Sequence, residues 1–115
     1  MSHYGDYIKE RLGKLIIESD KGFATYFFIE HPKHGSVVYI EDIYVVPEFR
    51  RSRAGTELAD FVVDVAKGRG IKVLLGSINP LANGSTESMK ALIWYGMKLD
   101  CIHNDLIYLY KDLEA

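Results

Sequence analysis

Cysteine and proline are scarce in this chain of 115 residues, which has one cysteine, three prolines and one tryptophan. A single cysteine excludes an intramolecular disulfide framework and CxxC-type zinc sites, and it suits a reducing, cytoplasmic setting. No run approaches the ~20 apolar residues of a membrane span, and Met1–Asp6 lacks the basic and apolar segments of a secretory signal. We therefore expect a soluble protein without a membrane partner.

The chain also lacks a strong charge of one sign. Its formal net charge is -2, so the broad basic face of a dedicated nucleic-acid binder is not expected. With 48% hydrophobic and 26% charged residues, the composition is that of one globular domain, which we place over residues 1–115. The positive charge is concentrated locally, because three of the fourteen lysines and arginines are Arg50, Arg51 and Arg53.

The residue pattern in the first half of the chain predicts a meander of three antiparallel strands. Runs rich in Ile, Phe, Tyr and Thr are typical of strands, and Asp20-Lys21-Gly22 has the chemistry of a tight hairpin turn. A short helix is also predicted before the first strand. The expected ranges are Tyr7–Leu12 for this helix, and Lys14–Ser19, Phe23–Glu30 and Val37–Val46 for the strands.

The centre of the chain predicts a strand, helix, strand unit. Apolar residues recur at steps of three and four over Ala54–Lys67, which indicates an amphipathic helix, and Ile71–Ile78 is an apolar run typical of a buried strand. If this strand shares a sheet with Val37–Val46, the two run parallel with a right-handed crossover. The predicted buried stripe of the helix is Leu58, Phe61, Val62, Val65 and Ala66.

The remaining residues predict a second helix and a hairpin. Ser85 or Thr86 can cap a helix that ends near Lys98. Its predicted buried stripe is Met89, Leu92, Ile93 and Met97. Two alternating segments then follow, Cys101–His103 and Leu106–Tyr110, with a turn at Asn104-Asp105. The fold class is therefore α/β (α+β), with a mixed, mainly antiparallel sheet, a central β-α-β unit and flanking helices.

The junction between Val37–Val46 and the helix at Ala54 is a predicted anion site. The first N–H groups of a helix have no internal partner, and the helix dipole adds positive potential there. Arginine side chains match phosphate oxygens, and Gly55 permits close backbone approach. From spacing alone, a solvated start of the helix is an equal alternative.

The segment from Tyr39 to Leu58 resembles motif A of the GNAT superfamily of N-acetyltransferases, and Tyr39–Arg50 is similar to the spermidine/spermine-type small-amine enzymes. The resemblance implies acetyl-CoA as co-substrate and a sheet splayed between Val37–Val46 and Ile71–Ile78. It implies pantetheine contacts from the backbone of Ile43, Tyr44 and Val45, and pyrophosphate contacts from the turn Arg50, Arg51, Ser52, Arg53, Ala54, Gly55 and Thr56. Arg53 stands where the family pattern has glycine.

The later helix carries a second resemblance. Ser88, Ala91 and Tyr95 follow the family's Asn-x-x-Ala-x-x-x-Tyr pattern, with serine in place of asparagine, and Leu99-Asp100 replaces a usual Gly-Phe. Spacings of three and seven place the three residues on one face of a helix. The resemblance implies a cofactor contact by Ser88 and implies that Tyr95 reprotonates the coenzyme A thiolate.

Acetyl transfer requires a neutral amine, so a base must take a proton from an ammonium whose pKa is ~10.4. Glu41 and Asp42 are the best-placed acids. Adjacent strand residues point to opposite faces, so we expect only one to face the acceptor, and Glu41 matches the substrate-contacting glutamate of the small-amine enzymes. The alternative is that both are solvated or structural acids of the strand, and Tyr108 is the reserve candidate for the acid after Tyr95.

Other reactive residues form weaker candidate sites. His31 and His34 share a loop and Cys101 and His103 share a strand face, yet neither pair completes a metal set, so no metal is expected. Neither GxGxxG nor GxxxxGK[ST] occurs, which disfavours a nucleotide-binding module.

The predicted function is direct transfer of an acetyl group to a primary amine, on a polyamine, another small molecule or a peptide. The alternative is a catalytically degenerate acyl-CoA-binding protein, because the residues at Arg53, Ser88 and Leu99-Asp100 depart from the family pattern. Oligomeric state is open, although the tyrosine-rich C-terminal strands suit a homodimer interface.

Overall fold

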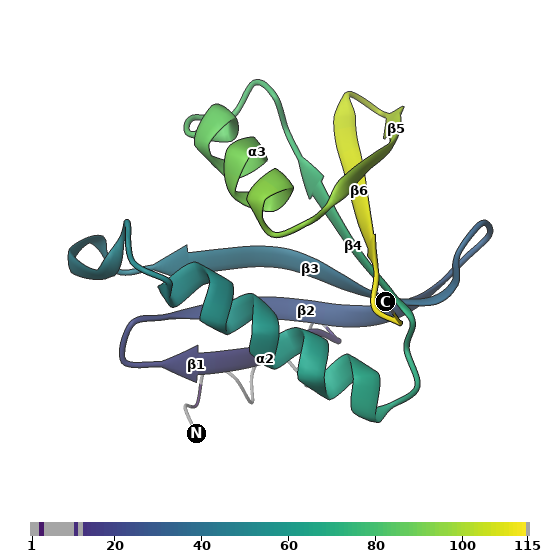
Figure 1. Cartoon of the computed structure of the whole chain (residues 1–115), viewed down its shortest axis with the longest axis horizontal. Coiled ribbons are helices and arrows are strands. Elements are labelled where there is room, and N and C mark those ends of the chain that lie inside the picture. Colours follow the sequence, from purple (N-terminus) through teal and green to yellow (C-terminus); the bar gives the residue numbers. More distant parts are fainter. Residues whose placement is uncertain (1–2, 4–10, 12, 115) are drawn as a thin grey trace.

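The computed structural model describes residues 3, 11 and 13–114, and it contains one sheet of six strands in the order β1-β2-β3-β4-β6-β5 (Figure 1). The sheet is mixed and mainly antiparallel, which confirms the predicted fold class. The strands are β1 (Leu15–Ser19), β2 (Gly22–His31), β3 (Gly35–Val45), β4 (Val73–Ile78), β5 (Lys98–His103) and β6 (Leu106–Asp112), and the helices are α2 (Ala54–Gly68) and α3 (Ser85–Trp94), with a 3-10 turn at Pro47–Phe49. The helix predicted for Tyr7–Leu12 lies, apart from Arg11, outside the described residues.

Strands β1, β2 and β3 form the predicted meander, and the turn at Asp20-Lys21 joins the first two. Gly22 is required at the start of β2, because an added Cβ would lie 1.9 Å from the carbonyl oxygen of Tyr44. The register between β2 and β3 shifts once, where Tyr26 pairs with Ile40 but Thr25 pairs with Asp42. Glu41 is therefore the extra residue of a β-bulge.

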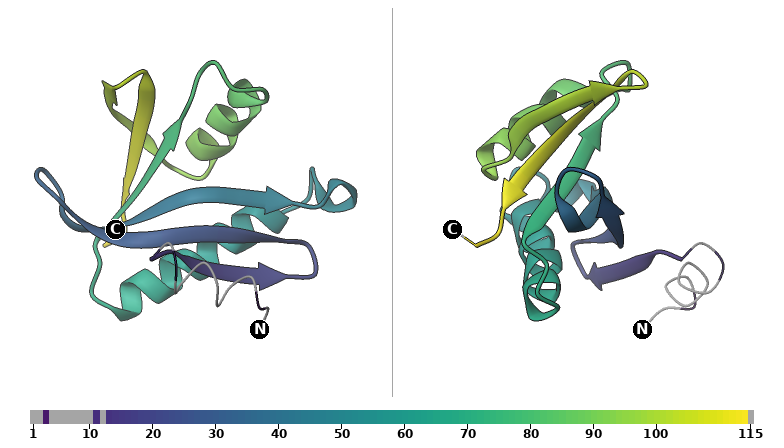
Figure 2. Two further views of the ribbon diagram at one scale, coloured as in Figure 1. Left: turned by 180° about the vertical axis from the view of Figure 1, so that it is seen from behind. Right: turned by 90° about the vertical axis from the view of Figure 1, so that its right-hand side faces the viewer.

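The predicted parallel pairing of β3 and β4 is confirmed, but it is short. Only Val37–Ile40 pairs with Val73–Gly76, while β3 continues to Val45 and β4 continues to Ile78. Figures 1 and 2 show the resulting divergence, with β4, β6 and β5 leaving the plane of the first three strands. The sequence prediction of a splay between these two strands is thus confirmed.

Helix α2 packs on the meander with a buried stripe that differs in part from the predicted one. Leu58, Val62 and Ala66 are buried as expected, but Phe61 is 51% exposed and Val65 is 40% exposed. The helix makes most of its contacts with β1, β2 and β3, and Phe61 and Val65 lie at the margin of the face that it turns toward these strands. The residues that it buries are Ala54, Leu58, Ala59, Val62, Val63 and Ala66.

Helix α3 ends earlier than predicted, at Trp94 rather than near Lys98. The N–H of Gly96 donates to the carbonyl of Ile93 and that of Met97 to the carbonyl of Leu92, both at 3.0 Å, and Gly96 has a φ of 98°. This is a Schellman motif, which ends a helix at a glycine in a left-handed conformation. Ile93, predicted to be buried, is 58% exposed. Met97 is buried as predicted, although it lies beyond the end of the helix.

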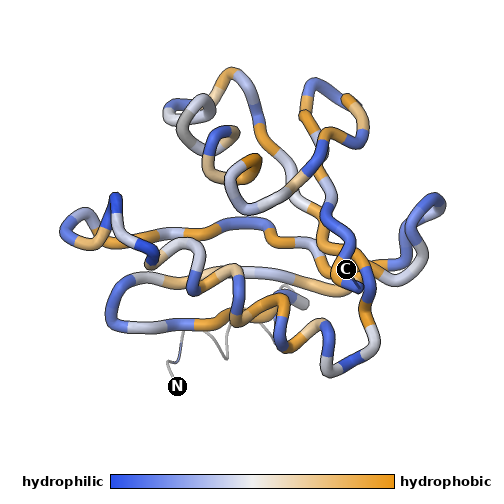
Figure 3. Tube along the Cα trace, in the orientation of Figure 1, coloured by the Kyte–Doolittle hydropathy of each residue, from blue (hydrophilic) through white to orange (hydrophobic). Residues whose placement is uncertain are grey.

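The main core lies between α2 and the sheet, and a smaller cluster lies on the opposite face around Val37, Val73 and Leu75. The hydropathy trace shows hydrophobic residues interspersed with hydrophilic ones along the strands and along α2 (Figure 3). Asn104 and Asp105 have positive φ values of 51° and 65°, as a two-residue hairpin turn requires, and this confirms the turn predicted there. Among the described residues, no helix is long and apolar enough to cross a membrane.

Candidate active site

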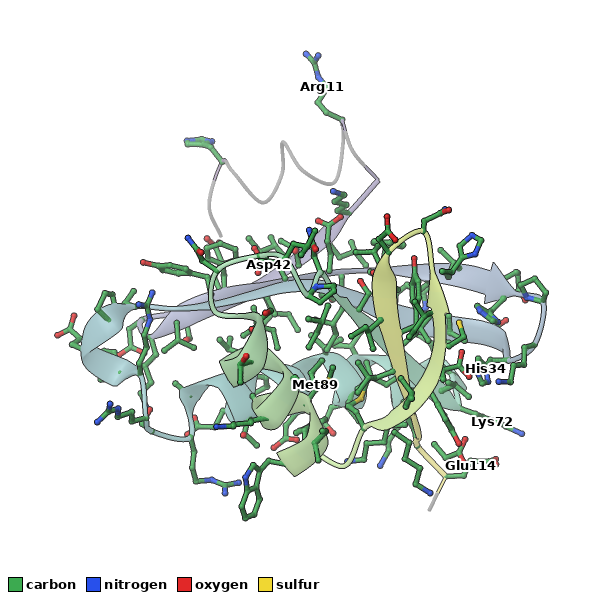
Figure 4. The ribbon with its side chains drawn as sticks, turned by 90° about the horizontal axis from the view of Figure 1, so that it is seen from above. Arg11, His34, Asp42, Lys72, Met89 and Glu114 are labelled. Atoms are coloured by element: carbon green, nitrogen blue, oxygen red, sulfur yellow. The ribbon has the colours of Figure 1, made fainter. Side chains whose placement is uncertain are left out.

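A cleft of about 750 Å³ opens where β3 and β4 diverge. Its volume lies within the usual range of small-molecule sites, roughly 300–1,000 Å³. Figure 4, viewed from above, labels Met89 on α3 and Asp42 on β3, two elements that contribute to the lining of this cleft. The lining comes from β3, the turn before α2, β4 and α3. It includes Glu41, Asp42, Ile43, Tyr44, Val45, Arg50, Arg51, Ser52, Gly55, Thr56, Ser88, Ala91 and Tyr95.

The backbone of β3 forms one wall of the cleft. Beyond Ile40, no described strand pairs with the edge of β3 that faces β4. The carbonyl of Tyr44 points toward β2, as its proximity to Gly22 shows, so alternation directs the N–H and C=O groups of Ile43 and Val45 into the cleft. The Tyr44 backbone, predicted as a pantetheine contact together with these two, therefore faces the neighbouring strand.

The turn before α2 places its residues unequally. Arg51, Ser52, Gly55 and Thr56 line the cleft, while Ala54 is 2% exposed and packs into the core. Ala54 lies on the inner stripe of α2, which turns its side chain away from the cleft. Arg53 is exposed and does not line the cleft; it is the N-cap of α2 and makes no side-chain capping hydrogen bond.

Arg53 stands where the family pattern has glycine, and its backbone angles show whether the turn needs a glycine there. Its φ of -86° is ordinary for any residue, so the conformation of the turn does not require glycine there. The strained position is Arg51, whose φ of 68° lies in the left-handed region. Ser52 supports the turn, since its hydroxyl donates to the Phe49 carbonyl and accepts the Ala54 N–H at 3.2 Å.

Arg50 joins this turn to the strand wall. Its Nε donates to the carbonyl oxygen of Val45 at 2.8 Å, and its guanidinium lies 5.5 Å from the centre of the Tyr44 ring. One of the two cleft-facing backbone carbonyls of β3 is therefore already bonded. Arg50 itself lines the cleft, so the other N–H groups of its guanidinium lie at the cleft margin.

The β-bulge at Glu41 contradicts the prediction that Glu41 and Asp42 point to opposite faces of the sheet. Ile40 and Ile43 both pack against the main core, although strict alternation would separate residues three apart. The extra residue shifts the phase of the strand by one, so both carboxylates lie on the side away from α2 and both line the cleft. Glu41 forms an ion pair with Lys14, whose Nζ lies 2.6 Å from Oε2.

Tyr95 lines the cleft together with Ser88 and Ala91, so the spacing of these three residues does place them on one surface. The Tyr95 hydroxyl donates to Oδ1 of Asp60 at 2.6 Å. Lys111 holds the other end, because its Nζ donates to the Tyr95 carbonyl at 3.0 Å and lies 4.3 Å from the ring centre.

The surroundings of Tyr95 raise its pKa above the ordinary value of 10.0. Burial is the main cause, followed by the hydrogen bond to Asp60 and the negative charges of Asp60 and Asp64. The phenol therefore stays protonated at neutral pH. Asp60 and Lys111 were missed from the sequence, and no local signal marks them, because they lie 35 and 16 positions from Tyr95.

The other reactive residues lie elsewhere. His34 Nε2 and Lys33 Nζ contact Oδ1 of Asp100, at 3.2 and 2.6 Å, and this ties the β2–β3 loop to β5. Cys101 is an exposed free thiol. Within residues 3, 11 and 13–114, no group of three His, Cys, Asp or Glu side chains is placed to hold a metal ion.

Tyr108, the alternative acid, pairs with Ser77 of β4 and Cys101 of β5. It does not belong to the described lining of the cleft. The geometry therefore brings Tyr95, and not Tyr108, to the wall of the cleft that faces β3.

A splayed sheet, a free edge of β3 and an arginine-bearing helix start together define an acyl-coenzyme A type of site. The family model described as "Acetyltransferase (GNAT) family" matches residues 4–85, which is more than half of the chain. The protein belongs to the GNAT family of acetyltransferases. The family resemblance stated from motif A is thus confirmed.

Relatives and structural neighbours agree with this assignment. The thialysine N-epsilon-acetyltransferase of Mus musculus is 38% identical over 61 residues, which cover 53% of this chain and 34% of that enzyme. The match thus spans about a third of the relative's length. A GNAT family acetyltransferase from Elizabethkingia anophelis with acetyl-CoA bound has the same fold, with a TM-score of 0.67, 17% identity and coverage of 93% of this chain and 82% of that chain.

A second solved structure has a similar fold. The PaiA N-acetyltransferase from Thermoplasma acidophilum, in complex with coenzyme A, has a TM-score of 0.69 at 14% identity. The similarity covers 91% of this chain and 65% of that chain. At these identities the two structures establish the shared fold.

Proposed function

We propose that the protein transfers an acetyl group from acetyl-CoA to a primary amine by direct attack. The observation that carries the proposal is the cleft itself, where the free edge of β3, the start of α2 and two carboxylates meet. Family membership and the acetyltransferase activity named for the mouse relative support it.

Acetyl-CoA is proposed to lie along β3 with its pyrophosphate at the start of α2. The N–H groups of Ile43 and Val45 are the donors that the geometry offers to the pantetheine arm, which would add to the sheet as a strand does. Arg51, Ser52, Gly55 and Thr56 line the phosphate end, where the helix dipole favours an anion. Ser88 lines the opposite wall, on α3.

The reaction requires a base, and Glu41 is proposed for this role. An alkyl ammonium has a pKa of ~10.4 and is mostly protonated at neutral pH, so it must lose a proton before it attacks the thioester. The carboxylate of Glu41 accepts this proton, and the amine nitrogen then bonds to the acetyl carbon. Asp42, brought to the same side by the bulge, adds negative charge that favours a cationic acceptor.

The leaving thiolate requires an acid, and Tyr95 is proposed for that role. Its raised pKa keeps the phenol protonated, which is the form a proton donor needs. To act, the O–H must turn from Asp60 to the sulfur, since the hydroxyl donates to that carboxylate in the structure. The acceptor is proposed to be a small-molecule or peptide amine, and the thialysine named for the mouse relative is a candidate of this class.

An acyl-CoA-binding protein without turnover is the second candidate. Two contacts favour it: Lys14 occupies the carboxylate of Glu41, and Asp60 holds the hydroxyl of Tyr95. In this alternative, binding needs only the strand edge and the helix start, which neither contact blocks.

Coenzyme A release from acetyl-CoA, measured over a panel of thialysine, polyamines, lysine analogues and peptide N-termini, tests the proposal. We expect release that depends on an amine and falls at least tenfold in Tyr95→Phe. The matched control is Tyr108→Phe, which should retain the rate because Tyr108 lies outside the cleft lining. Binding of acetyl-CoA with no amine-dependent release on any acceptor would establish the second candidate instead.

The setting of the protein is also a proposal. A cytoplasmic location suits the exposed thiol of Cys101, which a reducing compartment keeps free. A homodimer is proposed through the edge strand β5, where Leu99 is 64% exposed and Ile102 is 69% exposed. Sedimentation analysis of the wild type and of Ile102→Asp tests the dimer, and a monomeric wild type would contradict it.

A further inference from the structure

Lys14 lies where an acceptor amine is needed. Its Nζ is 2.6 Å from Oε2 of Glu41, and the two side chains are 30% and 37% exposed. Any amine that Glu41 deprotonates must lie within hydrogen-bonding distance of that carboxylate, about 2.6–3.2 Å. The ammonium of Lys14 already satisfies this condition, and its carboxylate partner lines the cleft.

We propose that Lys14 is a self-acetylation site, an inference that rests on the proposed function of the cleft. Lys14 is a primary alkyl amine on a flexible four-carbon stem, which is the same chemical class as the proposed acceptors. It immediately precedes β1, and its side chain reaches over the face of the sheet that also bears the two cleft carboxylates. No segment has to move aside for the first proton transfer.

The modification of Lys14 is an ordinary acetyl transfer. The Lys14 ammonium gives a proton to Glu41, and the neutral nitrogen forms a bond to the acetyl carbon of acetyl-CoA. The bond between that carbon and sulfur breaks, the nitrogen loses its second proton, and the departing thiolate gains one proton. The products are Nε-acetyl-Lys14 and coenzyme A, and the proton on Glu41 passes to solvent.

Acetylation would also change the site. An acetylated lysine has no positive charge, so the ion pair to Glu41 is lost. The carboxylate then becomes free to bind the ammonium of an external acceptor. Self-acetylation is therefore expected to occur fastest when acceptor amines are absent, and cationic amines that occupy Glu41 should slow it.

Lys33 supplies the matched control within the same chain. Its Nζ also lies 2.6 Å from a carboxylate, that of Asp100, but this pair joins the β2–β3 loop to β5 and does not line the cleft. The two lysines thus share the ion-pair distance, and neither lines the cleft itself. They differ in their carboxylate partners, because Glu41 lines the cleft and Asp100 does not. The Lys33 side chain is 62% exposed against 30% for Lys14, so uncatalysed acetylation by acetyl-CoA has no steric preference for Lys14.

The experiment incubates the full chain with acetyl-CoA and no amine, followed by intact-mass measurement and peptide mapping over time. We expect one acetyl group on Lys14, added at least tenfold faster than on Lys33, with a rate constant independent of protein concentration. Glu41→Gln should slow the modification of Lys14 at least tenfold and leave Lys33 unchanged, and Lys14→Arg should abolish the single addition.

The possible failures are distinguishable. If external amines are acetylated but Lys14 reacts no faster than Lys33, or if Glu41→Gln has no effect on Lys14, self-acetylation is refuted while the proposed function stands. If neither Lys14 nor any external amine is acetylated although acetyl-CoA binds, both the inference and the proposed function are refuted.

Discussion

Replacing Gly22 in β2 by alanine would displace β3, the strand that forms one wall of the cleft. The new Cβ would lie 1.9 Å from the Tyr44 oxygen and 2.9 Å from both the Tyr44 carbon and the Val45 Cα. The oxygen contact is about 1.5 Å shorter than the 3.4 Å at which ordinary contact begins. All three atoms are backbone, so β2 and β3 must separate at this point.

The cost follows from two terms. Overpacking of this kind costs about 1–3 kcal/mol. Separation of the strands also removes the hydrogen bond from the Val46 N–H to the Lys21 carbonyl, at 2.8 Å, which contributes about 1 kcal/mol. We therefore expect Gly22→Ala to lower the free energy of unfolding by about 2–4 kcal/mol and to weaken acetyl-CoA binding by displacing Ile43 and Val45.

Urea unfolding followed by circular dichroism measures the first effect, and calorimetric titration with acetyl-CoA measures the second. Gly68→Ala is the control, because no atom lies within 4 Å of its added Cβ and its φ is not positive. Alanine near the end of α2 should raise the free energy of unfolding by up to about 1 kcal/mol. A Gly22→Ala protein within about 0.5 kcal/mol of the wild type would refute the close approach of β2 and β3.

Three further predictions concern single side chains. Asp60→Asn should lower the pKa of Tyr95, because a neutral acceptor no longer repels the phenolate. An alkaline titration followed by phenolate absorbance measures this pKa, with Tyr95→Phe to assign the signal. An unchanged pKa of Tyr95 would contradict the prediction. The pKa of Asp100 lies below its ordinary 3.8, chiefly through the Lys33 hydrogen bond, so its carboxylate stabilises the fold above that pH and ceases to do so as pH falls through the lowered pKa. Asp100→Asn should therefore cost about 1 kcal/mol near pH ~7, because the Lys33 partner is 62% exposed and solvent weakens the pair, and less near pH ~3. Urea unfolding at the two pH values measures the cost, and a pH-independent difference would refute this. Arg50→Ala should raise the KM for acetyl-CoA about tenfold in the release assay, with Arg50→Lys intermediate, because only arginine forms a fork to phosphate while holding the Val45 carbonyl; equal KM values would refute it.

The elements of the fold were predictable because they depend on local periodicity. The stripe of α2 and the apolar run of β4 repeat over distances at which burial dictates residue type. Prediction failed where a tertiary contact decides the outcome. The β-bulge at Glu41 exists only in the pairing of β3 with Thr25 and Tyr26, and the exposure of Phe61 depends on how far α2 overlaps the meander.

The candidate site divides in the same way. The turn from Arg50 to Thr56 is contiguous, so its residues identify it without a structure. The Asp60, Tyr95 and Lys111 group is assembled from α2, the end of α3 and β6. The Lys14–Glu41 pair joins the residue before β1 to β3. Such contacts leave no mark in a single sequence.

The opening between β3 and β4 is proposed to bind acetyl-CoA for transfer to an amine. A crystal structure of the protein with coenzyme A tests it most directly. We expect the pyrophosphate at Arg51–Thr56, the pantetheine arm along Ile43–Val45 and the sulfur between the diverging strands on the side of Glu41. Coenzyme A bound on another face, or with its sulfur remote from Glu41, would contradict it.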